Sequence, residues 1–298
     1  MTAPALPLRH SYLRAALGGL GSGLIKAFNT NKTSWVGLAL FLSVCSVALL
    51  APILATHDPL DQDILSRLQP PSAEHWMGTD NYGRDTYSRL IYGARISLVI
   101  GLGAIAIALV IGSCLGLAAG YYGGRTDILL MQIMDVMLAF PSLILGLIVV
   151  AMLGPSIPNI VAAIALTAIP PFARIARAPT IAVKAREFVE AGRALGFSDL
   201  RLMFGHILPN ILPEILVMGS LWLATAIRVE ASLAFIGLGV RPPAATWGGM
   251  IREGFEHILD SFWLALFPSL AILMVVFALN LLGDGLRDAI DPKLRGEH

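Results

Sequence analysis

Histidine, cysteine and glycine are the residues of this sequence whose chemistry could mark an enzyme, metal or nucleotide site. The six histidines lie in loops or near the chain ends, whereas a membrane-embedded enzyme needs titratable groups that converge within its spans. Cys45 and Cys114 lie inside apolar runs without companions at ligand spacing, so we expect them to be small packing residues. The glycines at 18–23 are followed by Leu24 and Ile25 instead of Lys and Ser or Thr, which fails the phosphate-loop pattern. The chain is therefore expected to be no enzyme and to hold no catalytic, cofactor or metal residues.

A few charged residues interrupt long apolar runs. An unpaired charge in the middle of a membrane costs about 2.5–3.5 kcal/mol, so we expect Asp135 to form a structural ion pair with Arg174 or Arg177. A proton relay is the weaker alternative, because relays use more titratable residues. Arg228 and Glu230 are two positions apart and cannot face each other on a helix, so they need different partners. Both are candidates for a water-filled path or its gate, and snorkelling or pairing with another subunit is an equal alternative.

The apolar runs themselves predict membrane spans. Hydrophobic residues make up 56% of the chain and charged residues 14%, against about 25% charged in soluble domains. The apolar residues come in blocks of about 20, the length that crosses roughly 30 Å of hydrocarbon. The expected fold class is an all-α integral membrane protein in contact with lipid, and the net charge of +1 disfavours a nucleic-acid partner. Six transmembrane helices are predicted, at 34–54, 96–119, 128–153, 160–178, 215–240 and 262–283.

The polar segments define the expected domain organisation. Most of the 21 Lys and Arg residues fall on the side of the chain ends, so the positive-inside rule predicts cytoplasmic N- and C-termini. The external segments carry many acids, which either dock a partner or keep the surface soluble. The expected parts are an N-terminal segment 1–33, a first span 34–54, an external segment 55–95, a core 96–283 that includes a cytoplasmic loop 179–212 and a second external segment 239–261, and a cytoplasmic tail 284–298.

Small residues and prolines predict how the spans pack. Gly112, Gly116 and Gly120 recur every fourth residue, a pattern that lets helices approach closely, within the chain or against a partner subunit. Pro141 and the pair Pro170–Pro171 predict kinks in the third and fourth spans.

The polar loop between the fourth and fifth spans carries the most specific signal. Residues 186–196 read Arg-Glu-Phe-Val-Glu-Ala-Gly-Arg-Ala-Leu-Gly, and Ser198-Asp199 open a second helical stretch that reaches Leu208-Pro209. Gly196 suits a left-handed helix stop, and Ser198 or Asp199 suits an N-cap, so the segment predicts a helical hairpin. Small residues at 191, 192 and 194 permit a partner to approach, and Glu190 and Arg193 supply charges that orient it.

This segment resembles the EAA loop of ABC importer permeases, whose pattern is Glu-Ala-Ala, three residues, Gly, nine residues, Ile, one residue, Leu-Pro. Glu190, Ala191 and Gly196 match it, and Leu208-Pro209 fall at the expected distance. Gly192 replaces the second Ala, and His206 replaces Ile and is expected to pack edge-on. In that family the loop couples the permease to an ATPase subunit. The resemblance assigns this role to Glu190, Ala191, Gly192, Arg193, Gly196, His206, Leu208 and Pro209.

Other stretches resemble the C-type permease subunit of dipeptide and oligopeptide importers. They are the segments 78–97, 234–248 and 280–294, and the likeness covers about residues 30–296. It implies the six-helix fold of type I ABC importer permeases in the bacterial inner membrane. It also implies a homologous B-type permease, two ATPase subunits that bind ATP and Mg²⁺, and an external solute-binding protein.

Two alternatives stay open for the function. The same architecture could import glutathione, opines or nickel chelates instead of dipeptides or longer peptides. A self-sufficient secondary transporter is the alternative of another class, and it predicts transport by this chain alone, with internal repeats and broken helices.

Overall fold

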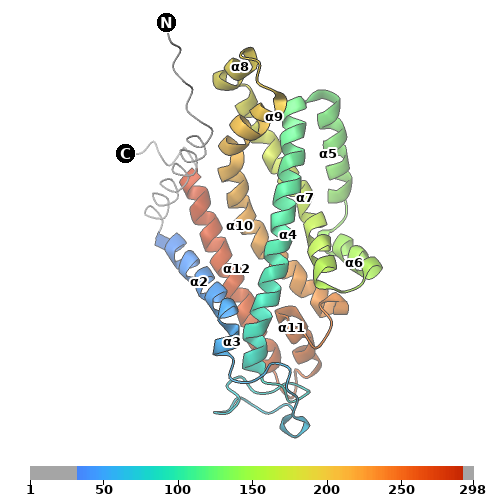
Figure 1. Cartoon of the computed structure of the whole chain (residues 1–298). Helices are drawn as coiled ribbons and strands as arrows, with labels where there is room; N and C mark the ends of the chain where they lie inside the picture. The colour runs from blue at the N-terminus through green and yellow to red at the C-terminus, as the bar shows by residue number, and fades with distance from the viewer. Residues whose placement is uncertain (1–31, 291–298) are drawn as a thin grey trace.

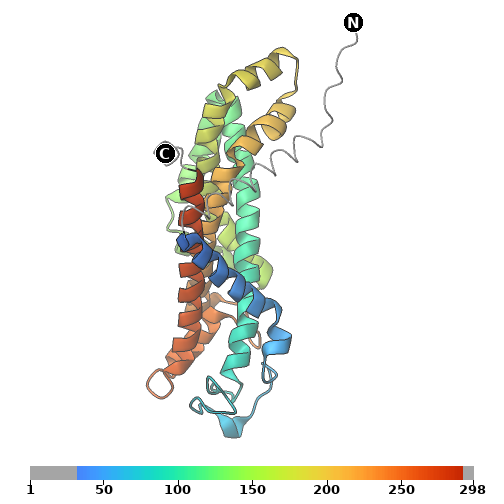
Figure 2. The same ribbon diagram turned by 90° about the vertical axis from the view of Figure 1, so that its left-hand side faces the viewer.

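The protein is an elongated bundle of helices in the computed structural model, which describes residues 32–290 (Figures 1 and 2). Within this range the structure is helical apart from loops and an isolated bridge between Thr79 and Asp85, which agrees with the all-α prediction. The predictions for residues 1–31 and 291–298 lie outside the described part. The helices are α2 (Lys32–Leu49), α3 (Ala51–Leu54), η1 (Ile64–Ser66), α4 (Thr86–Tyr122), α5 (Gly124–Leu138), α6 (Ser142–Leu153), α7 (Ile157–Lys184), α8 (Glu187–Ala194), α9 (Asp199–Leu202), η2 (Met203–Ile207), α10 (Leu208–Leu233), η3 (Ala234–Leu238), α11 (Trp247–Glu256) and α12 (Trp263–Ile290).

The long helices have the length and composition of membrane spans. Among the described residues, five continuous helical stretches could cross a membrane, and the pair α5 and α6 would make a sixth. That pair is bent by 86° next to Pro141, a far sharper break than the predicted kink. α7, in contrast, continues as one helix through Pro170 and Pro171. α4 begins at Thr86 and α12 continues to Ile290, so both helices extend beyond their apolar stretches.

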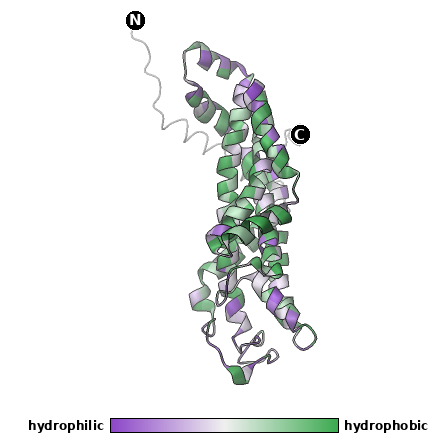
Figure 3. Ribbon diagram, turned by 90° about the vertical axis from the view of Figure 1, so that its right-hand side faces the viewer, coloured by the Kyte–Doolittle hydropathy of each residue, from purple (hydrophilic) through white to green (hydrophobic). Residues whose placement is uncertain are grey.

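The two ends of the bundle differ in what they carry. Residues 185–207 project as a hairpin at one end, called here the hairpin end, and residues 55–85 and 239–262 form the opposite loop end (Figure 1). Apolar residues line the long helices, and hydrophilic residues gather at both ends (Figure 3). Ser34 near the start of α2 contacts Gly285 near the end of α12, so the two ends of the described chain lie together, as an even number of crossings requires.

The glycine stripe of α4 packs against α7 of the same chain. A Cβ added at Gly116 would lie 2.1 Å from the carbonyl oxygen of Ala173, and one at Gly112 would lie 2.6 Å from the Cβ of Phe172. Both distances are too short for any side chain, so the backbones of the two helices touch almost directly. The stripe is therefore used inside this subunit, which decides between the two alternatives left open by the sequence.

Gly116→Ala is expected to lower thermal stability, because the added methyl group would meet the Ala173 carbonyl and overpacking costs about 1–3 kcal/mol. Gly103→Ala is the matched control on the same helix, since its added Cβ would lie 3.6 Å from Val161, an ordinary contact. Thermal unfolding of the purified variants in detergent measures the difference. Equal melting temperatures would contradict the close α4–α7 contact.

Candidate functional site

The hairpin at residues 185–207 has the helix, stop and helix that its sequence predicts. α8 ends where the Gly196 N–H donates to the Arg193 carbonyl and the Phe197 N–H donates to the Gly192 carbonyl, both at 3.0 Å. Gly196 has a φ of 79°, which a residue with a side chain adopts only with strain. The chain reverses there and enters α9 through Asp199.

An apolar seam holds the two arms of the hairpin together. Val189 on α8 is buried, as are Leu202 and Met203 on the second arm. A Cβ at Gly192 would lie 2.9 Å from Cδ2 of Leu202, so glycine at this position lets the second arm pack directly on α8. The departure from Ala at 192 is thus part of the packing of the hairpin.

His206 helps to fix the second arm by ring stacking. Its imidazole lies nearly parallel to the Phe197 ring, with an interplanar angle of 13° and 5.5 Å between centroids. The expected edge-on packing is therefore wrong, because Phe197 presents its face. The guanidinium of Arg201 lies 3.9 Å from the same ring centroid, a cation–π contact. Beyond His206, the side-chain amide of Asn210 donates to the His206 carbonyl at 2.6 Å.

Tyr121, the penultimate residue of α4, ties the hairpin to the bundle. Its side chain is 3% exposed, and its hydroxyl donates to Asp199 Oδ1 at 2.6 Å. The Lys184 ammonium at the end of α7 donates to the Tyr121 carbonyl, and the Arg193 guanidinium lies 5.8 Å from the centre of the Tyr121 ring. The ends of α4 and α7 and both arms of the hairpin therefore meet at one residue. Sequence reasoning missed this role of Tyr121, because its partners Asp199 and Lys184 lie 78 and 63 positions away in the chain.

The outer face of the hairpin combines charges with exposed apolar side chains. Glu190, Ala191 and Arg193 are exposed, as the predicted role requires. Leu195 is 74% exposed and Leu200 is 65% exposed, although both lie at the hydrophilic end of the molecule. Exposed apolar groups outside the lipid-facing helices are typical of a protein contact surface. These two leucines were not singled out from the sequence. Their signal was that they are apolar but lie outside the set Val189, Leu202 and Met203 that packs between the arms.

Two ion pairs join α5 to α7. Arg174 donates to Asp135 at 2.6 Å, so the expected pairing of these residues is present, on a surface where both side chains are about half exposed. Arg177 does not share Asp135, because it pairs with Asp127 through both carboxylate oxygens at 2.5 Å. Asp127 lies at the start of α5, outside the predicted span, and was therefore not considered as its partner.

Arg228 and Glu230 differ in their surroundings. Arg228 is exposed and donates to Thr225 Oγ1 at 3.1 Å. Glu230 is 1% exposed and accepts a hydrogen bond of 3.3 Å from Ser97 on α4. Glu230 therefore lies inside this subunit in this conformation, and its role as a pathway or gate residue stays a prediction.

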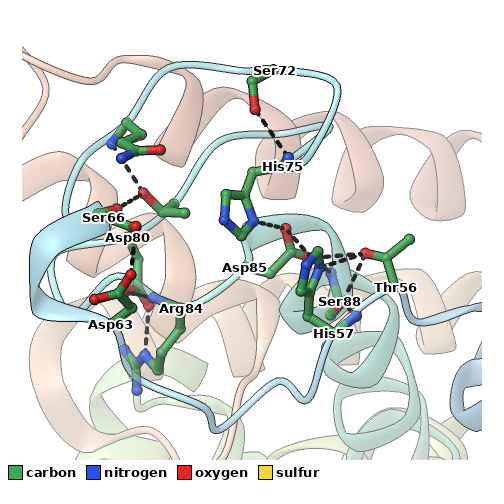
Figure 4. Close-up of polar contacts among 12 residues, drawn as sticks. Thr56, His57, Asp63, Ser66, Ser72, His75, Asp80, Arg84, Asp85 and Ser88 are labelled. Carbon is green, nitrogen blue, oxygen red and sulfur yellow. Dashed lines mark hydrogen bonds and ion pairs between the residues drawn. The ribbon is translucent and has the colours of Figure 1, made fainter.

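A buried ionic cluster organises the loop end. Arg84 and Arg89 are each 2% exposed, although they belong to the external segment 55–95, whose charges were expected at the surface. Asp80 Oδ2 lies 2.6 Å from Arg84 Nε and 3.2 Å from Arg89 Nε. Glu253 Oε2 on α11 accepts from Nη2 of Arg84 at 3.1 Å and from Nη2 of Arg89 at 3.2 Å. The cluster joins the outer loop, the start of α4 and α11 (Figure 4 shows its Asp80–Arg84 contact).

Comparison with known proteins shows similarity over most of the chain. Residues 112–296 match the family described as binding-protein-dependent transport system inner membrane component. Residues 21–71 match the N-terminal TM domain of oligopeptide transport permease C.

Individual relatives share about two fifths of their residues with this chain. The dipeptide transport system permease protein DppC of Alkalihalophilus pseudofirmus is 44% identical, covering 91% of this chain and 89% of that protein. The probable D,D-dipeptide transport system permease protein DdpC of Escherichia coli is 43% identical, covering 91% and 94%. The glutathione transport system permease protein GsiD of Pectobacterium atrosepticum is 42% identical, covering 85% of each chain.

Among solved structures, a chain of the MetNI methionine ABC transporter in an inward-facing conformation is similar in fold. The TM-score is 0.55 at 17% identity, over 68% of this chain and 97% of that chain. At this identity the likeness concerns the fold alone.

Tyr121→Phe is expected to loosen the hairpin, because it removes the hydrogen bond to the Asp199 carboxylate. Such bonds contribute about 1.5–3 kcal/mol, so amide exchange across residues 185–207 should accelerate by about tenfold or more. Hydrogen–deuterium exchange measures the change. Tyr122→Phe is the control, since that ring is 52% exposed. Unchanged exchange in Tyr121→Phe would show that Tyr121 does not hold the hairpin.

Proposed function

Because the chain belongs to the family of binding-protein-dependent transport system inner membrane components, we propose that it is a permease subunit of an ABC importer for peptides. The names of its relatives support this cargo, since DppC and DdpC are dipeptide permeases by name and are 43–44% identical to this chain. The glutathione permease at 42% identity keeps a small modified peptide within the same class of cargo. The chain is a multi-pass membrane protein, and we place it in the bacterial inner membrane.

The proposal rests on the hairpin, which packs on itself, is tied to α4 through Tyr121 and has an exposed contact face. ATPase subunits would bind this face, with Leu195 and Leu200 as apolar contacts and Glu190 and Arg193 as charges that orient the partner. ATP and Mg²⁺ would bind to those subunits, and this chain would hydrolyse nothing. The permease would have two arrangements. If the ATPase subunits bind the hairpin more tightly in one arrangement when ATP is present, ATP shifts the population toward that arrangement.

The contacts of Tyr121 give this shift a physical route. A push on α8 or α9 reaches α4 through the hydrogen bond between Tyr121 and Asp199. It reaches α7 through the chain itself and through the contact between Lys184 and the Tyr121 carbonyl. Since α4 and α7 pack backbone to backbone, they would move as a unit and carry the movement toward the loop end.

The remaining roles follow from position. A homologous B-type permease would complete the pathway, to which the exposed Arg228 is the charged candidate of this chain. The loop end would face outward and meet the solute-binding protein, while the hairpin would face the cytoplasm. A self-sufficient secondary transporter does not account for a hairpin that exposes leucines beyond the membrane-spanning helices.

Leu195→Asp is expected to abolish co-purification of the ATPase subunits and peptide-stimulated ATP hydrolysis, because it places a charge in the apolar part of the contact face. Leu259→Asp is the matched control for co-purification alone, since this residue is 97% exposed but lies at the loop end, away from the ATPase subunits. Pull-down and ATPase assays on the reconstituted transporter measure both. Normal ATPase binding by Leu195→Asp would remove the hairpin from the coupling contact.

Ala194→Cys and Ala73→Cys test the orientation, since both alanines are exposed and lie at opposite ends of the bundle. In a background without Cys45 and Cys114, a membrane-impermeant maleimide should label position 73 in right-side-out vesicles. It should label position 194 only in inverted vesicles. The reverse pattern would place the hairpin outside and end the proposal.

A further inference from the structure

The loop end brings together three side chains that are separated along the sequence. His57 follows α3, His75 lies in the outer loop, and Asp85 is the N-cap of α4 (Figure 4). His75 Nδ1 lies 3.0 Å from Asp85 Oδ1, and His57 Nδ1 lies 3.9 Å from the same oxygen. The centroids of the two imidazole rings are 4.8 Å apart. One possible ligand atom from each of the three residues lies within 4.8 Å of the other two.

The carboxylate at the centre is held in place from its other oxygen. Asp85 is 2% exposed, and its Oδ2 accepts hydrogen bonds from the Ser88 N–H at 2.8 Å and from the Thr56 hydroxyl at 3.3 Å. Oδ1 is left to face the two imidazoles. Such support from neighbouring donors fixes the orientation of a carboxylate that ligates a metal.

We propose that His57, His75 and Asp85 form a binding site for a divalent transition-metal ion such as Zn²⁺. Two imidazole nitrogens and a carboxylate oxygen form a ligand set that Zn²⁺ accepts, at about 2.0–2.2 Å each. The His75 Nδ1, now 3.0 Å from Asp85 Oδ1, would bind the ion through its lone pair after any proton on it passed to solvent. The His57 Nδ1 would leave its 3.0 Å contact with Thr56 Oγ1 to do the same. The site goes beyond the proposed transport role and contradicts the expectation that this chain holds no metal ligands.

The observed spacing suits closure on an ion after a small adjustment. Ligands at about 2.1 Å on a tetrahedral ion lie roughly 3.4 Å apart, so the Asp85–His75 distance already fits and His57 must move inward. His57 can do so because its side chain is 37% exposed, whereas the His75 side chain is 13% exposed. The exposed side of His57 leaves the fourth position of the ion open to water.

The ion would act as a staple across the outer segment. It would join the chain after the first span and the loop around His75 to the first turn of α4, the longest helix described. The ionic cluster of Asp80, Arg84 and Glu253 joins the neighbouring turn to α11, so the two sites together would fix the loop end. Histidine spacing alone did not reveal the site, because its ligands come from separate turns.

Zinc binding by the full-length chain, purified with its co-expressed subunits on a tag without histidine, tests the inference. After treatment with a chelator and titration with Zn²⁺, wild type should retain about one more ion per chain than the double variant His57→Ala/His75→Ala. Plasma mass spectrometry gives the stoichiometry, and competition with a chromogenic chelator gives the affinity.

His257→Ala is the matched control, because this histidine also lies at the loop end, after α11, and is outside the cluster. It should keep the wild-type stoichiometry. His57→Ala alone guards against misfolding, since its side chain is the most exposed of the three and its removal should still lower the affinity in a complex that elutes normally. Equal zinc content in wild type and double variant, or an unchanged affinity in His57→Ala, would overturn the site and leave a hydrogen-bonded cluster.

Discussion

The backbones of α4 and α7 touch along the glycine stripe, and this contact sets the positions of the hairpin and of the helices around it. Lipid removes most of the hydrophobic drive for helices to associate, so close packing must replace it. Gly112 and Gly116 provide it by letting α7 approach to within the space that a side chain would fill. The two helices then reach the hairpin end together. There Tyr121 of α4 bonds to Asp199 of the hairpin, and Lys184 of α7 bonds to the Tyr121 carbonyl.

The two ends of the α4–α7 pair differ in their interactions. At the loop end, Arg84 and Arg89 are buried against Asp80 and Glu253, and removing one partner of such a network leaves a buried charge at a cost of about 3–5 kcal/mol. The hairpin end buries few charges and instead exposes leucines. The ion pairs would keep the loop end in one shape, while the exposed leucines of the hairpin end would bind a partner subunit. A permease that is driven from one end needs both properties.

The sequence was most informative where the physics is local. The apolar blocks predicted the spans, and Gly196 with Ser198-Asp199 predicted the hairpin, because span length and helix stops depend on neighbouring residues. The failures concern tertiary packing. The pairing of Arg177 with Asp127, the burial of Glu230, the stacking of His206 on Phe197 and the gathering of His57 and His75 around Asp85 all depend on segments far apart in sequence. The 86° bend at Pro141 also exceeds what a proline alone predicts, since α7 passes through two prolines without a break.

If Tyr121 holds the hairpin to α4, the hairpin and the α4–α7 pair move as one unit. A distance measurement by electron spin resonance between labels at Ala194 on α8 and Tyr122, the last residue of α4, both exposed, tests this. The assembled transporter is examined without nucleotide and after trapping with ATP and vanadate. We expect a narrow distance distribution that is the same in both states. A distribution that shifts or broadens with nucleotide would show that the hairpin bends independently of α4 and α7, against this expectation.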